Sequence, residues 1–208
     1  TAWLVAATYF LVRKPPAPLA AGLCGIFALL TRPPLVAPAI VLAWCLTGES
    51  RHAARRRYLL AIAGGIVCLA LLQWALYGNP FVNGHGSPGS LFRADRVAGN
   101  VANYGYWFTL VHTPLFYVAV ALGLWAGGLA RLAWVALAIF AVEAAPYLAY
   151  FQFNDWETLR FLLPGLPLVL LTAAAGCIAV IRRSIPASLN GAAVVAVAWL
   201  IAVGSVMF

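Results

Sequence analysis

Glu143 is an acidic residue inside a long apolar segment of this chain. An ionisable group in a membrane span costs about 2.5 to 3.5 kcal/mol on insertion scales, so such a residue is a functional candidate by default. It lies just before Pro146, whose missing donor frees a backbone carbonyl nearby. Two interpretations stay open: the carboxyl group pairs with an arginine or a hydroxyl to hold two helices together, or it lines a substrate cavity and bonds to a sugar.

A second group of polar and aromatic residues occupies positions 151–160, and includes Asp155, Trp156, Glu157 and Arg160. An arginine there can hold a phosphate by charge-assisted, often bidentate, hydrogen bonds. The tryptophan can stack on a sugar or on an isoprenoid chain. The alternative is an ordinary interfacial anchor in which Glu157 and Arg160 form a local pair at helical spacing.

Further cations lie outside the basic clusters described below, at Arg32, Arg93 and Arg96. An anionic partner would account for them, and we expect Arg32, Arg93 and Arg160 to share one hollow. His112 is better explained as a hydrogen-bonded interface histidine than as an acid or a base. The four cysteines lack the paired spacing of a zinc or redox site, and we expect no metal-binding cluster of side chains.

The composition indicates which elements must position these residues. The 208 residues are 64% hydrophobic and only 9% charged, against roughly 25% charged in an ordinary soluble domain. Long apolar blocks alternate with short basic or Pro/Gly-rich stretches. We therefore exclude a water-soluble domain and predict an all-α, polytopic transmembrane helix bundle that forms a single domain over residues 1–208.

The net charge of +8 is concentrated beside the apolar blocks, as in Arg51 to Arg57 and in Arg182 and Arg183. Such clusters mark cytoplasmic loops, so the charge indicates orientation and no nucleic-acid partner. A span needs about 20 apolar residues. The predicted spans are 58–77, 115–130, 132–150, 161–181 and 189–208, with 1–12 as the second half of another.

Residues 19–48 are divided by Arg32, Pro33 and Pro34 into two short apolar runs. Because proline prevents helix continuation, we predict a helical hairpin with Arg32 at its outer apex; one long kinked span is the alternative. Residues 78–114 form the predicted extracytoplasmic loop, with a short interfacial helix near 91–101 and an aromatic belt after it. Gly64, Gly65, Gly123 and Gly127 are expected to let helices approach closely.

Three stretches carry a family resemblance: Phe27-Ala28-Leu29-Leu30-Thr31-Arg32-Pro33-Pro34, Tyr77-Gly78-Asn79-Pro80, and the Trp-x-x-x-Arg-Phe-x-x-Pro run from Trp156 to Pro164. Together they resemble the C-type glycosyltransferase superfamily, in particular the protein O-mannosyltransferases and the lipid A aminoarabinose transferases. The similarity extends over nearly the whole chain, and the run from Trp156 is its most specific part.

The resemblance implies an integral, multi-pass enzyme of the bacterial plasma (inner) membrane. It implies transfer of a sugar from a polyprenyl-phosphate donor to a lipid, glycan or protein acceptor on the extracytoplasmic side, among membrane lipids. The catalytic acid of such enzymes lies in a first large outer loop that nothing here matches. Neither Asp95 nor Asp155 takes that role, so the catalytic residue stays unknown and is expected on a segment preceding this fragment.

For the donor phosphate we expect Arg160 first, then Arg32, then Arg93. No cofactor is indicated, and a divalent metal ion is left open. The candidates for sugar or lipid contacts are Glu143, Asp155, Trp156, Glu157 and His112.

Two other classes of protein are consistent with the same composition. In a secondary transporter, Glu143 would couple protons and the break at Arg32 would be a discontinuous helix at the binding site. Against this, the chain has no internal repeat, and its lone charges gather near the predicted outer rim. A non-catalytic membrane scaffold is the third class.

Overall fold

The computed structural model describes residues 2–46, 51–82, 88–126, 130–151, 153 and 155–184. Within these ranges the chain contains helices and turns and no strand. Three of the described helices are long and apolar enough to cross a membrane, α4 (Arg51–Tyr77), α7 (Ala130–Leu148) and α8 (Leu166–Ser184), and a bent helix would make a fourth. The predicted all-α transmembrane bundle is confirmed.

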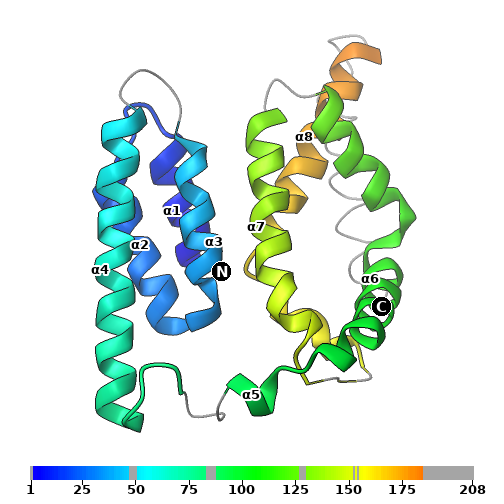
Figure 1. Cartoon of the computed structure of the whole chain (residues 1–208). Coiled ribbons are helices and arrows are strands. Elements are labelled where there is room, and N and C mark those ends of the chain that lie inside the picture. Colours follow the sequence, from blue (N-terminus) through cyan, green and yellow to red (C-terminus); the bar gives the residue numbers. More distant parts are fainter. Residues whose placement is uncertain are drawn as a thin grey trace.

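The N-terminal half contains α1 (Ala2–Val12), α2 (Pro18–Thr31), the short 3-10 helices η1 (Pro33–Leu35) and η2 (Leu42–Cys45), α3 (Val36–Val41) and α4. Helices α2 and α3 run in opposite directions, with the turn between them at one end of the bundle (Figure 1). Arg32 is extended at this turn, with φ −151°, and the following prolines start a new helix. The chain therefore forms the expected hairpin and not one kinked span.

Glycines bring α2 and α4 into close contact. A Cβ on Gly22 would lie 2.5 Å from that of Ala61, and a Cβ on Gly65 would lie 2.7 Å from Ile26 Cγ1. These distances leave no room for any larger residue. Gly65 thus has the expected packing role, whereas Gly64 faces open space.

The C-terminal half contains α5 (Pro88–Leu91), η3 (Ala94–Arg96), α6 (Val97–Ala126), α7, η4 (Trp156–Phe161) and α8. The chain bends by 90° between a first limb, Ala94–His112, and a second limb, Pro114–Trp125. Pro114 removes one backbone donor and crowds the preceding turn. The expected short interfacial helix is therefore the beginning of a longer one, which continues through the aromatic residues as far as the bend.

Helices α6 and α8 cross where Gly123 faces Thr172 and Gly176. A Cβ on Gly123 would overlap the carbonyl group of Thr172, and a Cβ on Gly176 would overlap the backbone of Gly123 and Ala119. This close crossing has the small-residue character expected of membrane helices. Gly127, the second glycine of the predicted pair, lies outside the described residues.

Several span boundaries differ from the prediction. The span predicted at 161–181 begins only at Leu166, because η4 and a turn at Pro164 and Gly165 precede it. Helix α4 begins inside the arginine cluster, seven residues before the predicted start at 58, because arginine is a good helix former. The predicted span 189–208 lies outside the described residues.

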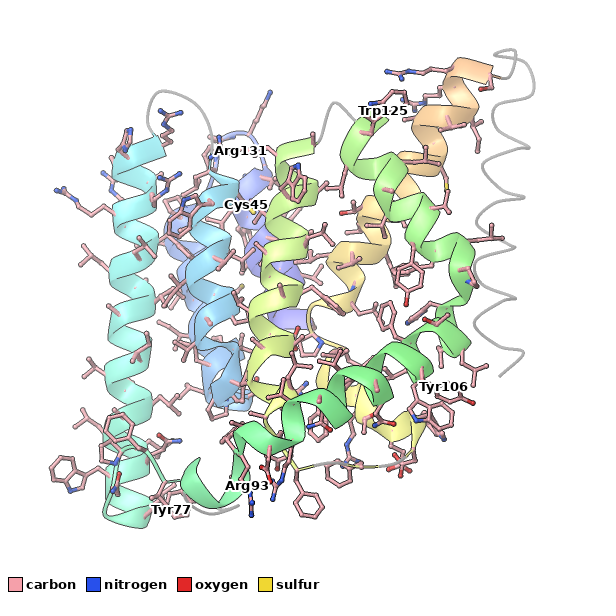
Figure 2. All side chains as sticks on the ribbon, turned by 45° about the vertical axis from the view of Figure 1, so that its right-hand side comes forward. Cys45, Tyr77, Arg93, Tyr106, Trp125 and Arg131 are labelled. Atoms are coloured by element: carbon pink, nitrogen blue, oxygen red, sulfur yellow. The ribbon has the colours of Figure 1, made fainter. Side chains whose placement is uncertain are left out.

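The bundle has two distinct ends. Figure 2 labels Trp125, Cys45 and Arg131 near one end and Tyr77, Arg93 and Tyr106 near the other. The first end, here called the basic end, also contains the start of α4 and the end of α8 (Figure 1), and therefore the basic clusters at 51–57 and 182–183. The opposite end contains the hairpin turn and is called the Arg32 end.

Candidate functional site

Two arginines that are 128 positions apart meet at the Arg32 end. Arg32 Nη1 donates to the carbonyl oxygen of Arg160 at 3.4 Å, and its Nη2 donates to the carbonyl oxygen of Phe161 at 3.3 Å and to the hydroxyl of Tyr147 at 3.4 Å. All three distances exceed the usual 2.7 to 3.2 Å. The guanidinium is therefore positioned by these groups but only weakly satisfied by them.

Aromatic rings contact both guanidinium groups. The Phe161 ring centroid lies 5.9 Å from Arg32 Cζ and 5.1 Å from Arg160 Cζ. Tyr147 stacks on Phe161 with centroids 4.8 Å apart and also contacts Arg32, while Phe153 contacts Arg160. Each contact has cation–π geometry. These five residues form what we call the Arg–aromatic cluster.

The cluster contains little negative charge. Among the described residues, no carboxylate forms a salt bridge with Arg32, and that of Arg160 is with Glu157 at 3.4 Å between largely exposed side chains. Such an exposed pair contributes little, because water screens it. The predicted local pair is present, yet the cluster retains unmatched positive charge that an anion would balance.

Glu143 lies one helical turn before Tyr147 on α7 and is 1% exposed. Neither carboxyl oxygen has a hydrogen-bond partner of good geometry within the described part of the chain, although a Cβ at Gly165 would lie only 2.5 Å from Oε2. The charge of Arg32 acts on this carboxyl group. Among the described residues, no arginine or hydroxyl group forms a hydrogen bond with Glu143, although Arg32 is near enough for its charge to act on it. Glu143 lies beneath the surface of the cluster.

Two asparagines that the sequence analysis did not select hold this region together. Asn100 is 2% exposed, and its Nδ2 donates to the carbonyl oxygens of Leu148 and Tyr150, each at 2.9 Å, and to that of Tyr147 at 3.4 Å. Asn103 Nδ2 donates to the carbonyl oxygen of Phe153 at 2.6 Å. They bind carbonyl groups of the last turn of α7 and of the segment that follows it. Their i, i+3 spacing on an apolar helix was the available signal.

The side chains next to Arg160 have local roles. Asp155 begins η4, and its Oδ1 accepts from the backbone N–H of Glu157 at 3.1 Å, as an N-cap does. Trp156 is exposed. These residues lie in the same short helix as Arg160, so they are near the cluster without forming part of its interior.

Arg93 lies at the same end, since its backbone N–H donates to the carbonyl oxygen of Ala149 at 2.7 Å. Its side chain, however, makes a two-point ion pair with Asp95, at 3.1 and 2.8 Å. This hydrogen-bonded pair holds the pKa of the Asp95 carboxyl group below its ordinary value. Two of the three expected arginines therefore come together, and the charge of the third is already matched.

His112 is not part of the cluster. Its ring lies 4.6 Å from that of Phe108 and 5.1 Å from that of Phe116, at the bend of α6. These neighbours are apolar rings and offer no acidic or basic partner. Its surroundings are those of a packed residue.

Exposed aromatic side chains flank the bundle at both ends. Trp125 is exposed toward the basic end, and Tyr77 and Tyr106 toward the Arg32 end (Figure 2). Trp44, whose carbonyl oxygen accepts from Arg131, is also exposed. Such belts mark the headgroup levels of a bilayer. The Arg–aromatic cluster lies at the same end of the bundle as Tyr77 and Tyr106.

The described residues contain no group of three or more His, Cys, Asp or Glu side chains that could hold a metal ion. Comparison with protein-family models, with curated proteins and with solved structures finds no match.

Proposed function

We propose that this chain is the membrane-embedded part of an enzyme of the bacterial plasma membrane. The enzyme transfers a sugar from a polyprenyl-phosphate donor to a lipid, glycan or protein acceptor on the extracytoplasmic side, at the Arg32 end. The observation that carries the proposal is the convergence of Arg32 and Arg160 on the ring of Phe161, away from the basic clusters.

A phosphate suits this arrangement on three grounds. Guanidinium groups bind phosphate oxygens through charge-assisted hydrogen bonds. The present bonds of Arg32, at 3.3 to 3.4 Å, are long enough to be exchanged for shorter ones. When the sugar leaves its donor, negative charge grows on the lipid phosphate, and cations already in place stabilise that charge.

The acceptor hydroxyl needs a base, and a carboxylate is the usual choice. Glu143 is enclosed and does not reach the surface of the cluster. We therefore assign the base to a residue outside the described chain, as the family resemblance implies. The proposed contribution of this chain is to bind and orient the donor.

One observation favours a second function. A buried carboxyl group that has no hydrogen-bond partner of good geometry among the described residues, in a helix able to span a membrane, is also typical of a proton-coupled secondary transporter. In that case Glu143 is the coupling residue.

The two functions are distinguished by variants of the full-length protein in liposomes. For the transferase, Arg32→Gln and Arg160→Gln should each weaken the binding of polyprenyl phosphate by roughly 10- to 100-fold, because each removes a charged hydrogen bond worth about 1.5 to 3 kcal/mol. Arg57→Gln, an exposed arginine of the basic end, is the matched control and should bind normally. Unchanged binding in both cluster variants would contradict the transferase.

Glu143→Gln provides the opposite arm of the test. If the protein is a transporter, this variant loses proton-coupled uptake while lipid binding is unaffected. If it is a transferase, the Glu143→Gln variant retains donor binding, and neither the variant nor the parent protein shows proton flux.

A further inference from the structure

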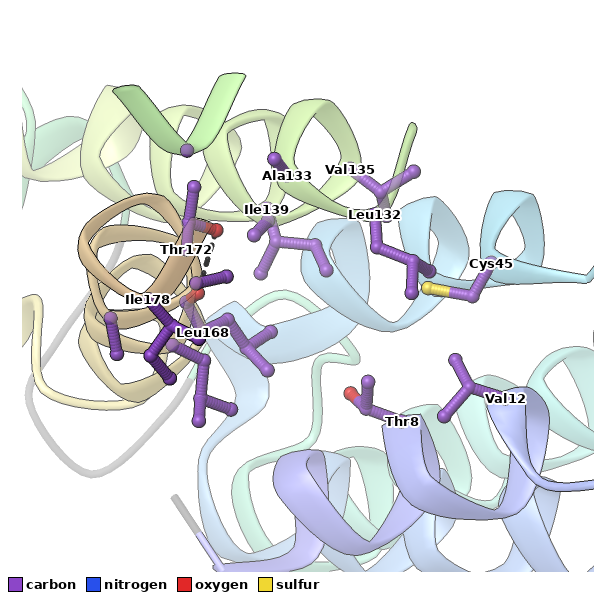
Figure 3. A pocket seen from close by; sticks show the side chains of 15 residues that line it. Thr8, Val12, Cys45, Leu132, Ala133, Val135, Ile139, Leu168, Thr172 and Ile178 are labelled. Atoms are coloured by element: carbon purple, nitrogen blue, oxygen red, sulfur yellow. Dashed lines mark hydrogen bonds between the residues drawn. The ribbon is translucent and has the colours of Figure 1, made fainter. Parts of the chain in front are cut away.

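An apolar cavity of about 400 Å³ lies between the two halves of the bundle, lined by 15 residues (Figure 3). Helices α1, α6, α7 and α8 and the short helix η2 contribute to it. Two lining side chains carry hydroxyl groups, and both donate to their own helix: Thr8 to the Leu4 carbonyl at 2.9 Å and Thr172 to the Leu168 carbonyl at 3.0 Å. Both hydroxyl groups are therefore already hydrogen-bonded, and a hydrocarbon chain can occupy the cavity without displacing water from an unpaired hydroxyl group.

One rim of the cavity lies among cations of the basic end. Val12 lines the cavity and directly precedes Arg13 and Lys14, both of which are exposed. Cys45, another lining residue, sits between two residues whose carbonyl oxygens accept from Arg131.

That contact places Arg131 at the rim. Its Nη2 donates to the carbonyl oxygens of Trp44 at 3.0 Å and Leu46 at 3.4 Å, and its charge acts on the Cys45 thiol. Leu132, which follows it in sequence, lies beside Cys45 in the cavity wall (Figure 3). The cavity thus combines a hydrocarbon interior with a cationic rim.

The cavity ends before it reaches the Arg–aromatic cluster. Along α7 its lining runs from Leu132 to Ile139, which is about 10 Å at 1.5 Å per residue. That length is most of one leaflet, since half of the hydrocarbon core is about 15 Å. Val12 and Leu171 are exposed lining residues, so the cavity is open to its surroundings.

We propose that this cavity binds one acyl chain of an anionic phospholipid, with the lipid phosphate held by Arg13, Lys14 and Arg131. Basic pockets between membrane helices on the cytoplasmic side bind acidic headgroups in this way. A zwitterionic lipid would bring the same chain without the net charge that complements the rim. The site lies at the end opposite to the proposed donor site and does not depend on the proposed function.

The test is photolabelling of the full-length protein in nanodiscs. The probes are phosphatidylglycerol and phosphatidylcholine that carry the same acyl chain with a diazirine near its middle. We expect at least fivefold more labelling by phosphatidylglycerol, with adducts in peptides that contain 132–139 and 168–178. Equal labelling by the two lipids, or adducts confined to peptides that do not line the cavity, would overturn the proposal.

Two pairs of variants separate chain binding from headgroup binding. Ala136→Phe fills the cavity and should reduce phosphatidylglycerol labelling severalfold, whereas Ala138→Phe, on an exposed face of the same helix, should not. The double change Arg13→Gln and Lys14→Gln should abolish the preference for the anionic lipid, and Arg57→Gln should retain it. Because Ala136 is buried, Ala175→Phe at a half-buried lining position repeats the first test if Ala136→Phe fails to fold. Undiminished labelling in the filled variants, or a peptide of a second copy crosslinked in the cavity, would refute the proposal.

Discussion

Arginines at the two ends of the bundle interact with carbonyl groups in different ways. At the basic end, Arg55 Nε donates to the Ala43 carbonyl at 3.1 Å and Arg131 Nη2 donates to the Trp44 carbonyl at 3.0 Å. These bonds satisfy the carbonyl groups at the end of η2, and they tie α4 and α7 to it. At the Arg32 end, every hydrogen bond of Arg32 is 3.3 Å or longer. These arginine–carbonyl bonds of the basic end, which join helices, are thus shorter than the bonds of Arg32 at the other end.

Arg93 shows a third use of the same side chain. Its two-point pair with Asp95 gives it a matched charge within two residues of sequence. Proximity to the cluster is therefore not sufficient for a role in anion binding. What distinguishes Arg32 and Arg160 is weaker pairing: Arg32 has no salt bridge among the described residues, and Arg160 has a single contact with Glu157 at 3.4 Å.

The largest effect is expected when both arginines of the cluster are changed together. Arg32→Gln with Arg160→Gln should weaken polyprenyl-phosphate binding by 100-fold or more, about 3 kcal/mol, because two charged hydrogen bonds are lost. Thermal unfolding should change little. Equilibrium binding to labelled lipid measures the first quantity, and a large loss of stability with intact binding would reverse the comparison between the two ends.

A second change acts beneath the cluster. Gly165→Ala places a Cβ about 2.5 Å from Glu143 Oε2 and 3.3 Å from Phe140 Cα, and overpacking of this kind costs roughly 1 to 3 kcal/mol. Combining it with Glu143→Ala should recover part of that loss. Denaturant unfolding of the parent protein, the two single variants and the double variant measures the four free energies of unfolding. Strict additivity would show that the two residues do not touch.

Asn100→Ala tests how the cluster is supported. It removes a donor from three carbonyl groups of the α7 end, and leaving buried acceptors unpaired costs about 1 to 3 kcal/mol. Chemical denaturation should show this loss. Asn100→Asp, which keeps the size but supplies no amide donor, should be at least as destabilising. If neither variant lowers the free energy of unfolding, Asn100 does not stabilise the site.

At the basic end, Arg131→Gln should reduce the free energy of unfolding by about 1 kcal/mol, because a charged but exposed hydrogen bond is lost. Polyprenyl-phosphate binding at the Arg32 end should be unchanged. Parallel unfolding and binding curves check both expectations. A defect in donor binding here would show that the two ends are coupled.

The smallest effect is expected for Arg93→Gln. Without its hydrogen-bonded partner, the pKa of Asp95 should rise toward the ordinary value for aspartate. In the parent protein the pair contributes above that ordinary pKa, and the contribution is lost as the pH falls through the lowered one. NMR titration of the Asp95 carboxyl carbon follows this shift, and an identical titration in both proteins would show that the pair does not form in solution.

Much of the fold follows from the order of residues along the chain. Apolar length and the basic clusters specify the spans, and Pro33 and Pro34 specify the hairpin turn. The late start of α8 and the long first limb of α6 were missed. At the start of α8 the residues are apolar enough for either assignment, so hydropathy alone does not decide between a helix and a turn. The first limb of α6 carries polar residues such as Asp95, Asn100 and Asn103, which led to its assignment as a loop.

The candidate site is less accessible to sequence reasoning. Arg32 and Arg160 were selected because topology does not explain their charge, and the structure brings them together. Asn100 and Asn103 were missed, because their i, i+3 spacing places them on one helix face but does not show which carbonyl groups they bind. The pairing of Arg93 with Asp95 was equally hidden, since side-chain geometry and not spacing decides it.

The sequence by itself determined that this is a helical membrane protein. Long apolar segments with few charges favour burial in lipid, and a helix satisfies all of its backbone hydrogen bonds there. Only the tertiary structure decided which arginines are satisfied and which are not. That property depends on carbonyl groups more than 80 positions away, as for Arg131 and Trp44 or Arg32 and Phe161. Distances between such groups arise from helix packing, and no local sequence pattern encodes them.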